Sequence, residues 1–366
     1  MHEDEVMEQL ESRGVDTVVS LPCDKNKRFT DSLYGRFKVV DVTREEDGVG
    51  VCAGAFLAGL RPVMSIQSSG IGNMLNAMMS LTACYHLPLV ILASWRGLED
   101  ERIEAQRCFN PRIPGLLSVY GIGCWDVAAA SDIPKVGKAV ERAYRENTIE
   151  VVLIHPTMWE GSDRLFSVED YPAERSGYPV RYEGPAGQTG LTRLEAIGRI
   201  MDSVDDDDIV VSNIGVPSKE VYASRDRPLN FYMLGSYTQA TPIGYGMSLG
   251  TDRRVHVIDG DGSILGSSIL PVLSGEMPEN LTVYCLDNGT FGSTGNQMNP
   301  AYSRVDMAAV AAGFGLRTTD IGSGEDIPSA VGSGAFVRIR ILPGNSRSPN
   351  IPLSAVEIRD RFEKAL

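Results

Sequence analysis

The sequence predicts an α/β protein made of two doubly wound parallel-sheet domains. Short β-rich apolar runs alternate with helical patterns along the chain, which is typical of parallel sheets covered by helices on both faces. One segment, 171–190, is rich in Pro, Gly and Tyr, has no apolar period and interrupts this alternation. We therefore expect a first domain at 1–170, a linker at 171–190 and a second domain at 191–366.

The expected elements of the first half follow from apolar runs and helical periods. Strands are expected at 16–21, 37–42, 62–66, 88–93 and 150–154, with helices at 45–60, 72–83 and 133–145. In the second half, Thr192 and Glu195 have capping-box spacing and begin an expected helix that ends near Met201. Further strands are expected at 208–212, 255–258, 281–286 and 336–341, and a last helix at 354–364.

Composition narrows the class of protein. The 366 residues are 43% apolar and 22% charged, which fits a globular chain of two domains. A net charge of −14 disfavours binding to nucleic acid or to an anionic membrane. The acidic N-terminus is unlike a signal peptide, no apolar run is long enough to span a bilayer, and the six cysteines form no CxxC pair. We expect a cytoplasmic protein with neither nucleic-acid nor membrane partners.

The most informative motif is Gly260-Asp261-Gly262, which follows an expected strand and leads into a helix at Ser263. Such a turn offers backbone N–H groups and the positive end of a helix to an anion. The Asp261 carboxylate would repel that anion unless a divalent cation bridged the two. Mg²⁺ prefers carboxylate and phosphate oxygens of this kind.

A second polar turn, Asp287 to Phe291, follows the next expected strand. The 24 residues between the two turns, 263–286, suffice for one helix and one strand. Both turns should therefore emerge at the same edge of a parallel sheet, where ligands bind in open α/β folds. The side-chain oxygen of Asn288 and a main-chain carbonyl of this turn are the expected further metal ligands.

This pattern resembles the signature of thiamine diphosphate (ThDP)-dependent enzymes, although Asp287 stands where the family has its first Asn. The resemblance implies ThDP and Mg²⁺ as cofactors, with Asp261, Asn288 and the carbonyl of Thr290 as metal ligands. It also implies cofactor contacts from the residues of both turns: Gly260, Asp261, Gly262, Ser263, Asn288, Thr290 and Phe291. The alternative is an ordinary strand-to-helix turn with a capping Asp.

The family also has a pyrimidine-binding domain with a glutamate that activates the cofactor. That glutamate must stay protonated or share its proton in a fairly apolar site. Counting back nine residues from Gly54, the family's spacing, gives Glu45, and Glu46 is the alternative. Without the motif in the second half, either residue would be interpreted as an ordinary acidic helix start.

Two more segments resemble cofactor-binding elements of the family. The turn 67–73 resembles the lining of the pyrimidine pocket and contributes Ser69, Gly70 and Asn73. The segment 234–237 resembles the element that holds the diphosphate and wedges the two rings of the cofactor, and it contributes Gly235, Ser236 and Tyr237. Tyr237 stands where Met, Ile or Leu is more usual, which puts the wedge itself in question.

The compact order, with no central domain, resembles sulfopyruvate and phosphonopyruvate decarboxylases. The segments 21–25 and 44–48 look more like the former, with its two subunits fused in one chain. The resemblance implies a carboxy-lyase that converts 3-sulfopyruvate to sulfoacetaldehyde in coenzyme M biosynthesis. The alternatives are phosphonopyruvate decarboxylase or another ThDP-dependent 2-oxo acid lyase or synthase. It further implies a homodimer or higher homo-oligomer, with each cofactor held between chains.

An anionic 2-oxo acid with a second anion needs basic groups in its pocket. We expect Asp24, Lys25 and Arg96 at the substrate, with Lys27 and Arg28 as further basic candidates. A degenerate binding module would be expected to lose Glu45, Asp261 or Asn288, and all three are present. A Rossmann dehydrogenase is a weaker alternative, because the first strand is not followed by GxGxxG.

Two further features have mainly structural interpretations. His2, His86, His155 and His256 form no catalytic pair, so structural roles are expected, although His86 could reach the site. The acidic run Asp205–Asp208 is interpreted as a solvated loop that leads into a strand, with cation binding as the alternative.

Overall fold

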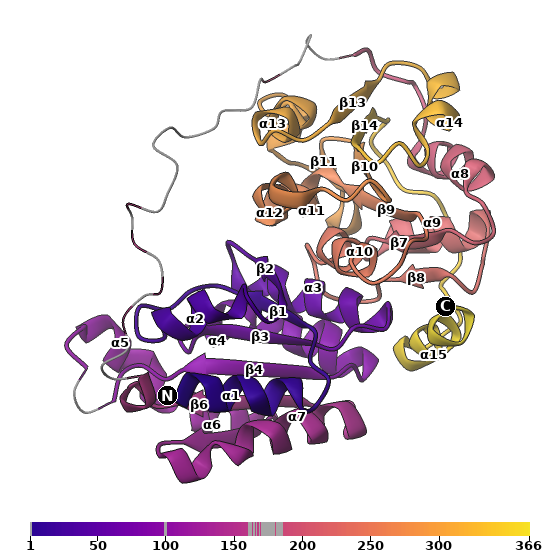
Figure 1. Ribbon diagram of the computed structural model, residues 1–366. Helices are drawn as coiled ribbons and strands as arrows, with labels where there is room; N and C mark the ends of the chain where they lie inside the picture. The colour runs from indigo at the N-terminus through magenta and orange to yellow at the C-terminus, as the bar shows by residue number, and fades with distance from the viewer. Residues whose placement is uncertain are drawn as a thin grey trace. The chain divides into compact units, whose positions relative to one another are not determined.

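The computed structural model describes residues 2–98, 101–159, 163, 165, 167, 169, 180 and 186–366. The chain forms two compact units, Met1–Ser176 and Gly177–Leu366, each built on a six-stranded sheet (Figure 1). The division falls within the expected linker 171–190, most of which lies outside the described residues. Every helix in the described ranges is too short or too polar to cross a bilayer.

The first unit has a parallel sheet with the strand order β2-β1-β3-β4-β6-β5. Its strands are β1 Thr17–Ser20, β2 Lys38–Asp41, β3 Pro62–Gln67, β4 Leu89–Ser94, β5 Gly123–Val127 and β6 Ile149–Ile154. Its helices are α1 His2–Glu11, α2 Lys27–Leu33, α3 Glu45–Leu57, α4 Gly70–Ala77, α5 Glu104–Phe109, α6 Ile113–Val119 and α7 Pro134–Glu146. The expected helix at 72–83 is α4 together with a π-helical turn, Met78–Ala83.

Alternate residues of each strand face opposite sides of this sheet, so two cores form. On one side Val18, Val63 and Val152 pack against α1, α2 and α7. Helices α3 and α4 lie on the other side (Figure 1). Because both faces are covered, β1, β3, β4 and β6 are nearly continuous apolar runs, which explains why they could be predicted.

The second unit also has a parallel six-stranded sheet, in the order β13-β14-β10-β9-β7-β8. Its strands are β7 Ile209–Ser212, β8 Asn230–Tyr232, β9 Val255–Gly260, β10 Leu281–Asp287, β13 Thr318–Ile321 and β14 Phe336–Arg340, with a short antiparallel pair of β11 Thr290–Phe291 and β12 Gln297–Met298. Its helices are α8 Arg193–Ser203, α9 Val216–Ser224, α10 Ala240–Ser248, α11 Asp261–Gly266, α12 Ile269–Glu276, α13 Met307–Gly313, α14 Ile327–Ala330 and α15 Ala355–Ala365. The capping box expected at Thr192 is present, and Ser354 forms another.

The two units share one topology, although no repeat is visible in the sequence. If β7, β8, β9, β10, β13 and β14 are renumbered one to six, both sheets have the order 2-1-3-4-6-5. In each unit, the connections after the first and second strands run in opposite directions along the sheet. A topological switch point therefore lies between β1 and β3 in the first unit and between β7 and β9 in the second. Ligands of doubly wound sheets bind at the carboxyl ends of the strands that flank such a point.

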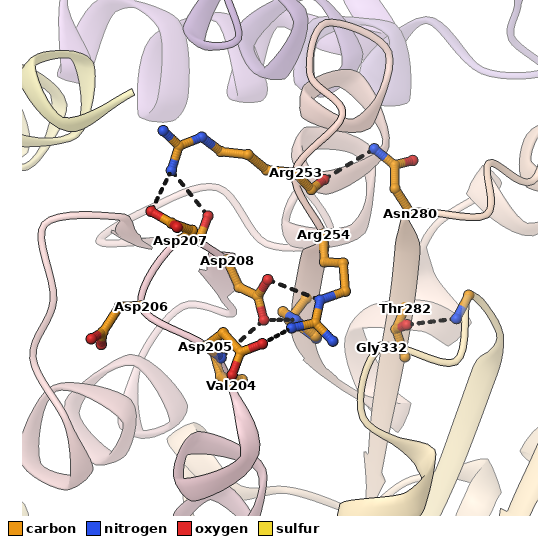
Figure 2. Close-up of polar contacts among 12 residues, drawn as sticks. Val204, Asp205, Asp206, Asp207, Asp208, Arg253, Arg254, Asn280, Thr282 and Gly332 are labelled. Atoms are coloured by element: carbon orange, nitrogen blue, oxygen red, sulfur yellow. Dashed lines mark hydrogen bonds and ion pairs between the residues drawn. The ribbon is translucent and has the colours of Figure 1, made fainter.

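The acidic run Asp205–Asp208 lies before β7, and arginines neutralise it (Figure 2). Arg254 binds Asp208 at 3.0 Å and also pairs with Asp205, while Arg253 lies 3.5 Å from Asp207. Asp208 is buried rather than solvated, which corrects part of the sequence interpretation. These arginine partners explain the run without a bound cation.

The histidines have surroundings that fit structural roles. His256 is fully buried and contacts Asp208 at 3.0 Å and Tyr284 at 3.1 Å. His155 Nε2 lies 3.0 Å from an Asp126 carboxylate oxygen. His86 is exposed in a turn, with a left-handed φ of 51°.

Candidate active site

The carboxyl ends of β9 and β10 bring the two polar turns of the second unit together. Asp261, the first residue of α11, is only 2% exposed. The amide of Asn299 donates a 2.7 Å hydrogen bond to Asp261 Oδ2, and its backbone N–H donates to the carbonyl of Gly289 at 2.9 Å. Asn299, a residue that the sequence analysis did not identify, therefore ties the Asp261 turn to the Asn288–Thr290 turn.

Asn288 and Thr290 are both buried beside this junction. The Thr290 N–H donates to Asn288 Oδ1 at 2.9 Å, which fixes the orientation of the amide. An amide oxygen has two lone pairs, so Asn288 can accept this bond and still offer one lone pair to a metal ion.

The electrostatics at Asp261 favour a nearby cation. Burial raises the pKa of Asp261 to about 6, the Asn299 hydrogen bond opposes this shift, and the negative charge of Asp287 adds to it. Within the described residues, no Lys or Arg forms an ion pair with Asp261. The described part of the chain also has no cluster of three or more His, Cys, Asp or Glu side chains suited to a metal. A metal here would therefore depend on one carboxylate together with amide, carbonyl and cofactor oxygens.

Asp287, the departure from the family pattern, has a cationic partner. The guanidinium of Arg338 contacts its carboxylate at 2.8 Å and lies 3.3 Å from Asp306 and from Asp320. Arg338 is only 2% exposed, so this pairing takes place in a buried setting. The extra carboxylate at position 287 is thereby balanced inside the protein.

The Gly235–Tyr237 segment carries conformational strain and unsatisfied polar atoms. Ser236 and Thr238 adopt left-handed φ angles of 64° and 76°, which are costly for residues with a Cβ. Ser236 Oγ and Gln239 Oε1 are buried and form no hydrogen bond with a described residue. Tyr237 OH donates to the carbonyl of Gly262, so the segment lies against the Asp261 turn.

The two polar turns and Tyr237 line a cavity of about 1030 Å³ in the second unit, whereas Gly235 and Ser236 are not among its lining residues. Eight of the predicted cofactor residues line it: Tyr237, Gly260, Asp261, Gly262, Ser263, Asn288, Thr290 and Phe291. The lining also includes residues that the sequence analysis missed, among them Asn213, Gly215, Lys219 and Ser293. Asn213 and Gly215 directly follow β7, so their place at the carboxyl end of a buried strand was a signal that could have identified them.

In the first unit, three predicted residues meet around one carboxylate. Glu45 is the first residue of α3 and is 9% exposed. The Asn73 amide donates to Glu45 Oε2 at 3.0 Å. A Cβ on Gly70 would lie 2.4 Å from Glu45 Oε1, so only glycine permits this approach. Ser69, next to Gly70, receives a 2.5 Å hydrogen bond from the Gln67 amide.

Glu46, the alternative, has a different environment. Its carboxylate pairs with Arg44 at 3.0 Å. Burial raises the pKa of Glu46, and the positive charge of Arg44 opposes that shift. The contacts with the predicted pyrimidine-binding turn are made by Glu45.

Of the two basic residues predicted for the substrate, Arg96 has its charge matched by carboxylates. Arg96 is buried and binds both oxygens of Glu101, at 2.7 and 3.1 Å, and Asp24 at 2.5 Å. The hydrogen bonds from Arg96 lower the pKa of Glu101 to about 2 against the opposing effect of burial, so the pair stays ionised. Arg96 thus joins the loops after β1 and β4, while Lys25 is exposed. Of the other basic candidates, Lys27 lies 3.7 Å from Asp163.

Comparison with known proteins shows the family of the chain. Residues 3–112 match the family model "thiamine pyrophosphate enzyme, N-terminal TPP binding domain", and residues 215–335 match its C-terminal counterpart. Sulfopyruvate decarboxylase of Methanosarcina acetivorans is 36% identical over 383 residues, which cover 100% of this chain and 97% of that one. The chain belongs to the thiamine diphosphate-dependent decarboxylases.

Two other proteins are similar to this chain over most of its length. Phosphonopyruvate decarboxylase of Streptomyces viridochromogenes is 32% identical over 95% of this chain and 91% of its own. Benzoylformate decarboxylase of Polynucleobacter necessarius has a TM-score of 0.69 with 11% identity, covering 96% of this chain and 99% of its own, and this likeness supports the fold alone. The two parallel six-stranded sheets and this likeness confirm the expected α/β fold class, and the described residues form no third domain.

The residues of the second unit fit the metal and diphosphate of ThDP. The buried Asp261 carboxylate lacks a cationic partner among the described residues, and Asn288 offers an amide oxygen beside it. Ser236 Oγ is a buried hydroxyl without a partner in the described chain, as expected of a group that donates to an anion.

Proposed function

We propose that this enzyme decarboxylates an anionic 2-oxo acid with ThDP and Mg²⁺, and that the substrate is 3-sulfopyruvate, which yields sulfoacetaldehyde for coenzyme M biosynthesis. The observation that carries the proposal is the identity to sulfopyruvate decarboxylase across both halves of the chain. Glu45 and the Asp261–Asn288 pair provide the side chains that the chemistry requires. When bound, ThDP supplies the electron sink for loss of CO₂.

The second unit would hold the charged end of the cofactor. Asp261, Asn288 and the carbonyl of Thr290 would bind Mg²⁺, and the Ser236 hydroxyl would donate to the diphosphate. Tyr237 would take the wedge position, where its hydrogen bond to Gly262 limits its rotation. The strained backbone at 236–238 supports this role, because such strain clusters at ligand clamps.

The first unit would act on the aminopyrimidine. Glu45 would hold a proton at N1′, and the Asn73 amide and the close approach of Gly70 would keep its carboxyl group in place. Because Gly70 has no Cβ, the Glu45 carboxyl group can occupy the space that a side chain at position 70 would fill. Proton transfer by a positioned group of this kind contributes roughly 10²–10⁴-fold to rate.

The proposed enzyme is a cytoplasmic homodimer or higher homo-oligomer, with each ThDP held between two chains. Three large apolar side chains at the cavity, Leu234, Tyr237 and Phe291, are 41%, 45% and 37% exposed. Covering such groups by another surface is favourable, because apolar area leaves water. The opposing surface would be the pyrimidine-binding unit of a second chain.

Phosphonopyruvate is the second candidate substrate, because a phosphonopyruvate decarboxylase is 32% identical over 95% of this chain. The test is to incubate the protein with ThDP, Mg²⁺ and each of 3-sulfopyruvate, phosphonopyruvate and pyruvate, and to assay the aldehyde and CO₂. We expect 3-sulfopyruvate to give the highest kcat/KM. Turnover of phosphonopyruvate alone would change the assigned substrate to phosphonopyruvate. Formation of a condensation product instead of an aldehyde would show that the enzyme is a synthase.

A further inference from the structure

The cavity of the second unit extends from the Asp261 and Asn288 turns to helix α9 and the 291–294 segment. Besides the residues of the two turns, the lining includes the polar residues Arg193, Lys219, Ser293, Thr294 and Asn350. None of them was assigned to the cofactor. The cavity therefore has polar groups for a second ligand.

The two cations of this lining differ in their partners. Arg193 is buried and binds both carboxylate oxygens of Glu220, at 2.6 and 3.3 Å, so its charge is matched. Lys219, in the first turns of α9, is half-buried. Among the described residues, its ammonium group has neither a hydrogen bond nor an ion pair. Lys219 thus gives this part of the wall a positive charge that the described chain does not balance.

Arg193 also helps to hold the neighbouring segment in place. It donates to Asn345 Oδ1 at 2.9 Å, and the Asn345 amide donates to the carbonyl of Gly292 at 2.7 Å. One residue further on, Ser293 Oγ lies only 2.5 Å from the position that a Cβ on Gly215 would occupy. The Ser293 hydroxyl therefore lies beside Gly215 at the start of α9, the helix that carries Lys219.

We propose that Lys219, together with the Ser293 hydroxyl, binds the second anionic group of the substrate. The inference rests on the proposed function, because it assumes a 2-oxo acid with such a group. A tetrahedral anion, sulfonate or phosphonate, accepts hydrogen bonds from an ammonium and a hydroxyl at once, and bonds of this charge-assisted kind are strong. Arg96 of the first unit is less suited to this task, since Glu101 and Asp24 already take up its donors.

The competing occupant is the cofactor, because its diphosphate is also an anion and Asp261 and Asn288 line the same cavity. The two assignments differ in what Lys219→Gln should change. Loss of a contact to the substrate raises KM and leaves kcat and ThDP affinity nearly intact. Loss of a contact to the diphosphate weakens ThDP binding, whichever substrate is assayed.

The experiment compares the ThDP–Mg²⁺ holoenzymes of the wild type, Lys219→Gln and Lys219→Arg. Lys364→Gln, which changes an exposed lysine of α15, is the matched control. KM and kcat are measured with 3-sulfopyruvate, phosphonopyruvate and pyruvate. Lys219→Gln should raise KM for the acids with a second anion by roughly 10- to 100-fold, leave pyruvate unaffected and keep the wild-type Kd for ThDP. Lys219→Arg should restore most of the wild-type KM. The acid whose KM rises more in Lys219→Gln identifies the anion.

A binding measurement makes the test independent of turnover. The unreactive 3-sulfopropanoate, titrated into each holoenzyme by calorimetry, should bind the wild type and Lys364→Gln alike and bind Lys219→Gln at least about tenfold more weakly. Equal affinity for all three proteins, or a weakened Kd for ThDP with unchanged KM, would overturn the assignment. If the wild type turned over none of the acids, the proposed function would fail, yet the calorimetric comparison would still decide whether Lys219 binds the anion.

Discussion

Glu45 and Glu46 are adjacent in the sequence, but their carboxylates have different partners. Glu45 contacts Asn73 and approaches Gly70, whereas Glu46 pairs with Arg44. The geometry thus favours Glu45 as the activating residue. It also explains why counting residues alone left two candidates, since contacts made 28 positions away decide between them.

Glu45→Gln should bind ThDP with nearly wild-type affinity and lose turnover by roughly 10²–10⁴-fold, because the proton at N1′ matters on the reaction path and little for binding. ThDP affinity by calorimetry and exchange of the cofactor C2 proton by NMR measure the two effects. Glu46→Gln is the control and should exchange normally. Loss of exchange in Glu46→Gln alone would transfer the role to Glu46.

Asp261→Ala should weaken ThDP binding by roughly 100-fold or more and reduce its dependence on Mg²⁺, because a small octahedral ion loses a charged oxygen ligand. Titration of ThDP at several Mg²⁺ concentrations measures both effects. Asp207→Ala, which removes an exposed carboxylate from the loop before β7, is the control. An unchanged Mg²⁺ dependence in Asp261→Ala would show that the metal lies elsewhere.

At the scale of elements, strands buried on both faces were predictable, whereas of the edge strands β2 was predicted and β5, β8 and β13 were missed. β5 has alternating exposure, and β8 has only three residues, so neither gives a continuous apolar run. The cofactor turns were predictable because each follows a buried strand at one sheet edge. Asn299 was not, because its role depends on a hydrogen bond to Asp261 across 38 positions.

The 235–238 segment should be a place where stability and binding conflict. Ser236→Gly removes both a left-handed φ that is unfavourable for serine and a buried hydroxyl without a described partner. We expect the cofactor-free protein to gain about 1 kcal/mol in free energy of unfolding, while ThDP binds more weakly. Urea unfolding without ThDP and calorimetry with it provide the two values. Ser236→Ala, which keeps the strained φ, should gain less stability, and a destabilised Ser236→Gly would contradict this account.

The loop before β7 should make the second unit sensitive to acid. Burial raises the pKa of Asp208, but hydrogen bonds and charge from His256 and Arg254 outweigh it and lower the value to about 2. A carboxyl group with a lowered pKa stabilises the fold above its ordinary value of about 4, and this contribution is lost as the pH falls toward 2. The difference in unfolding free energy between wild type and Asp208→Asn should therefore shrink from pH 6 to pH 3. A constant difference across urea titrations at these pH values would be evidence against the assignment.

At the scale of the whole molecule, two units of identical strand order each carry residues that the proposed function assigns to ThDP. The first carries Glu45, Asn73 and Gly70, and the second carries the Asp261–Asn288 pair. The common topology could not be predicted from the sequence, because equal strand order does not require equal residues. Assembly could be predicted only through the family, in which each cofactor lies between two chains.

We propose that Glu45 of one chain and Asp261 of another serve the same ThDP. The most direct test is to co-express Glu45→Gln and Asp261→Ala chains with different tags and to purify the mixed dimer. One of its two sites then carries both substitutions and the other carries neither, so the account predicts about half the wild-type decarboxylase activity per dimer. Dimers of either variant alone should be almost inactive. A mixed dimer no more active than these parents would contradict the claim.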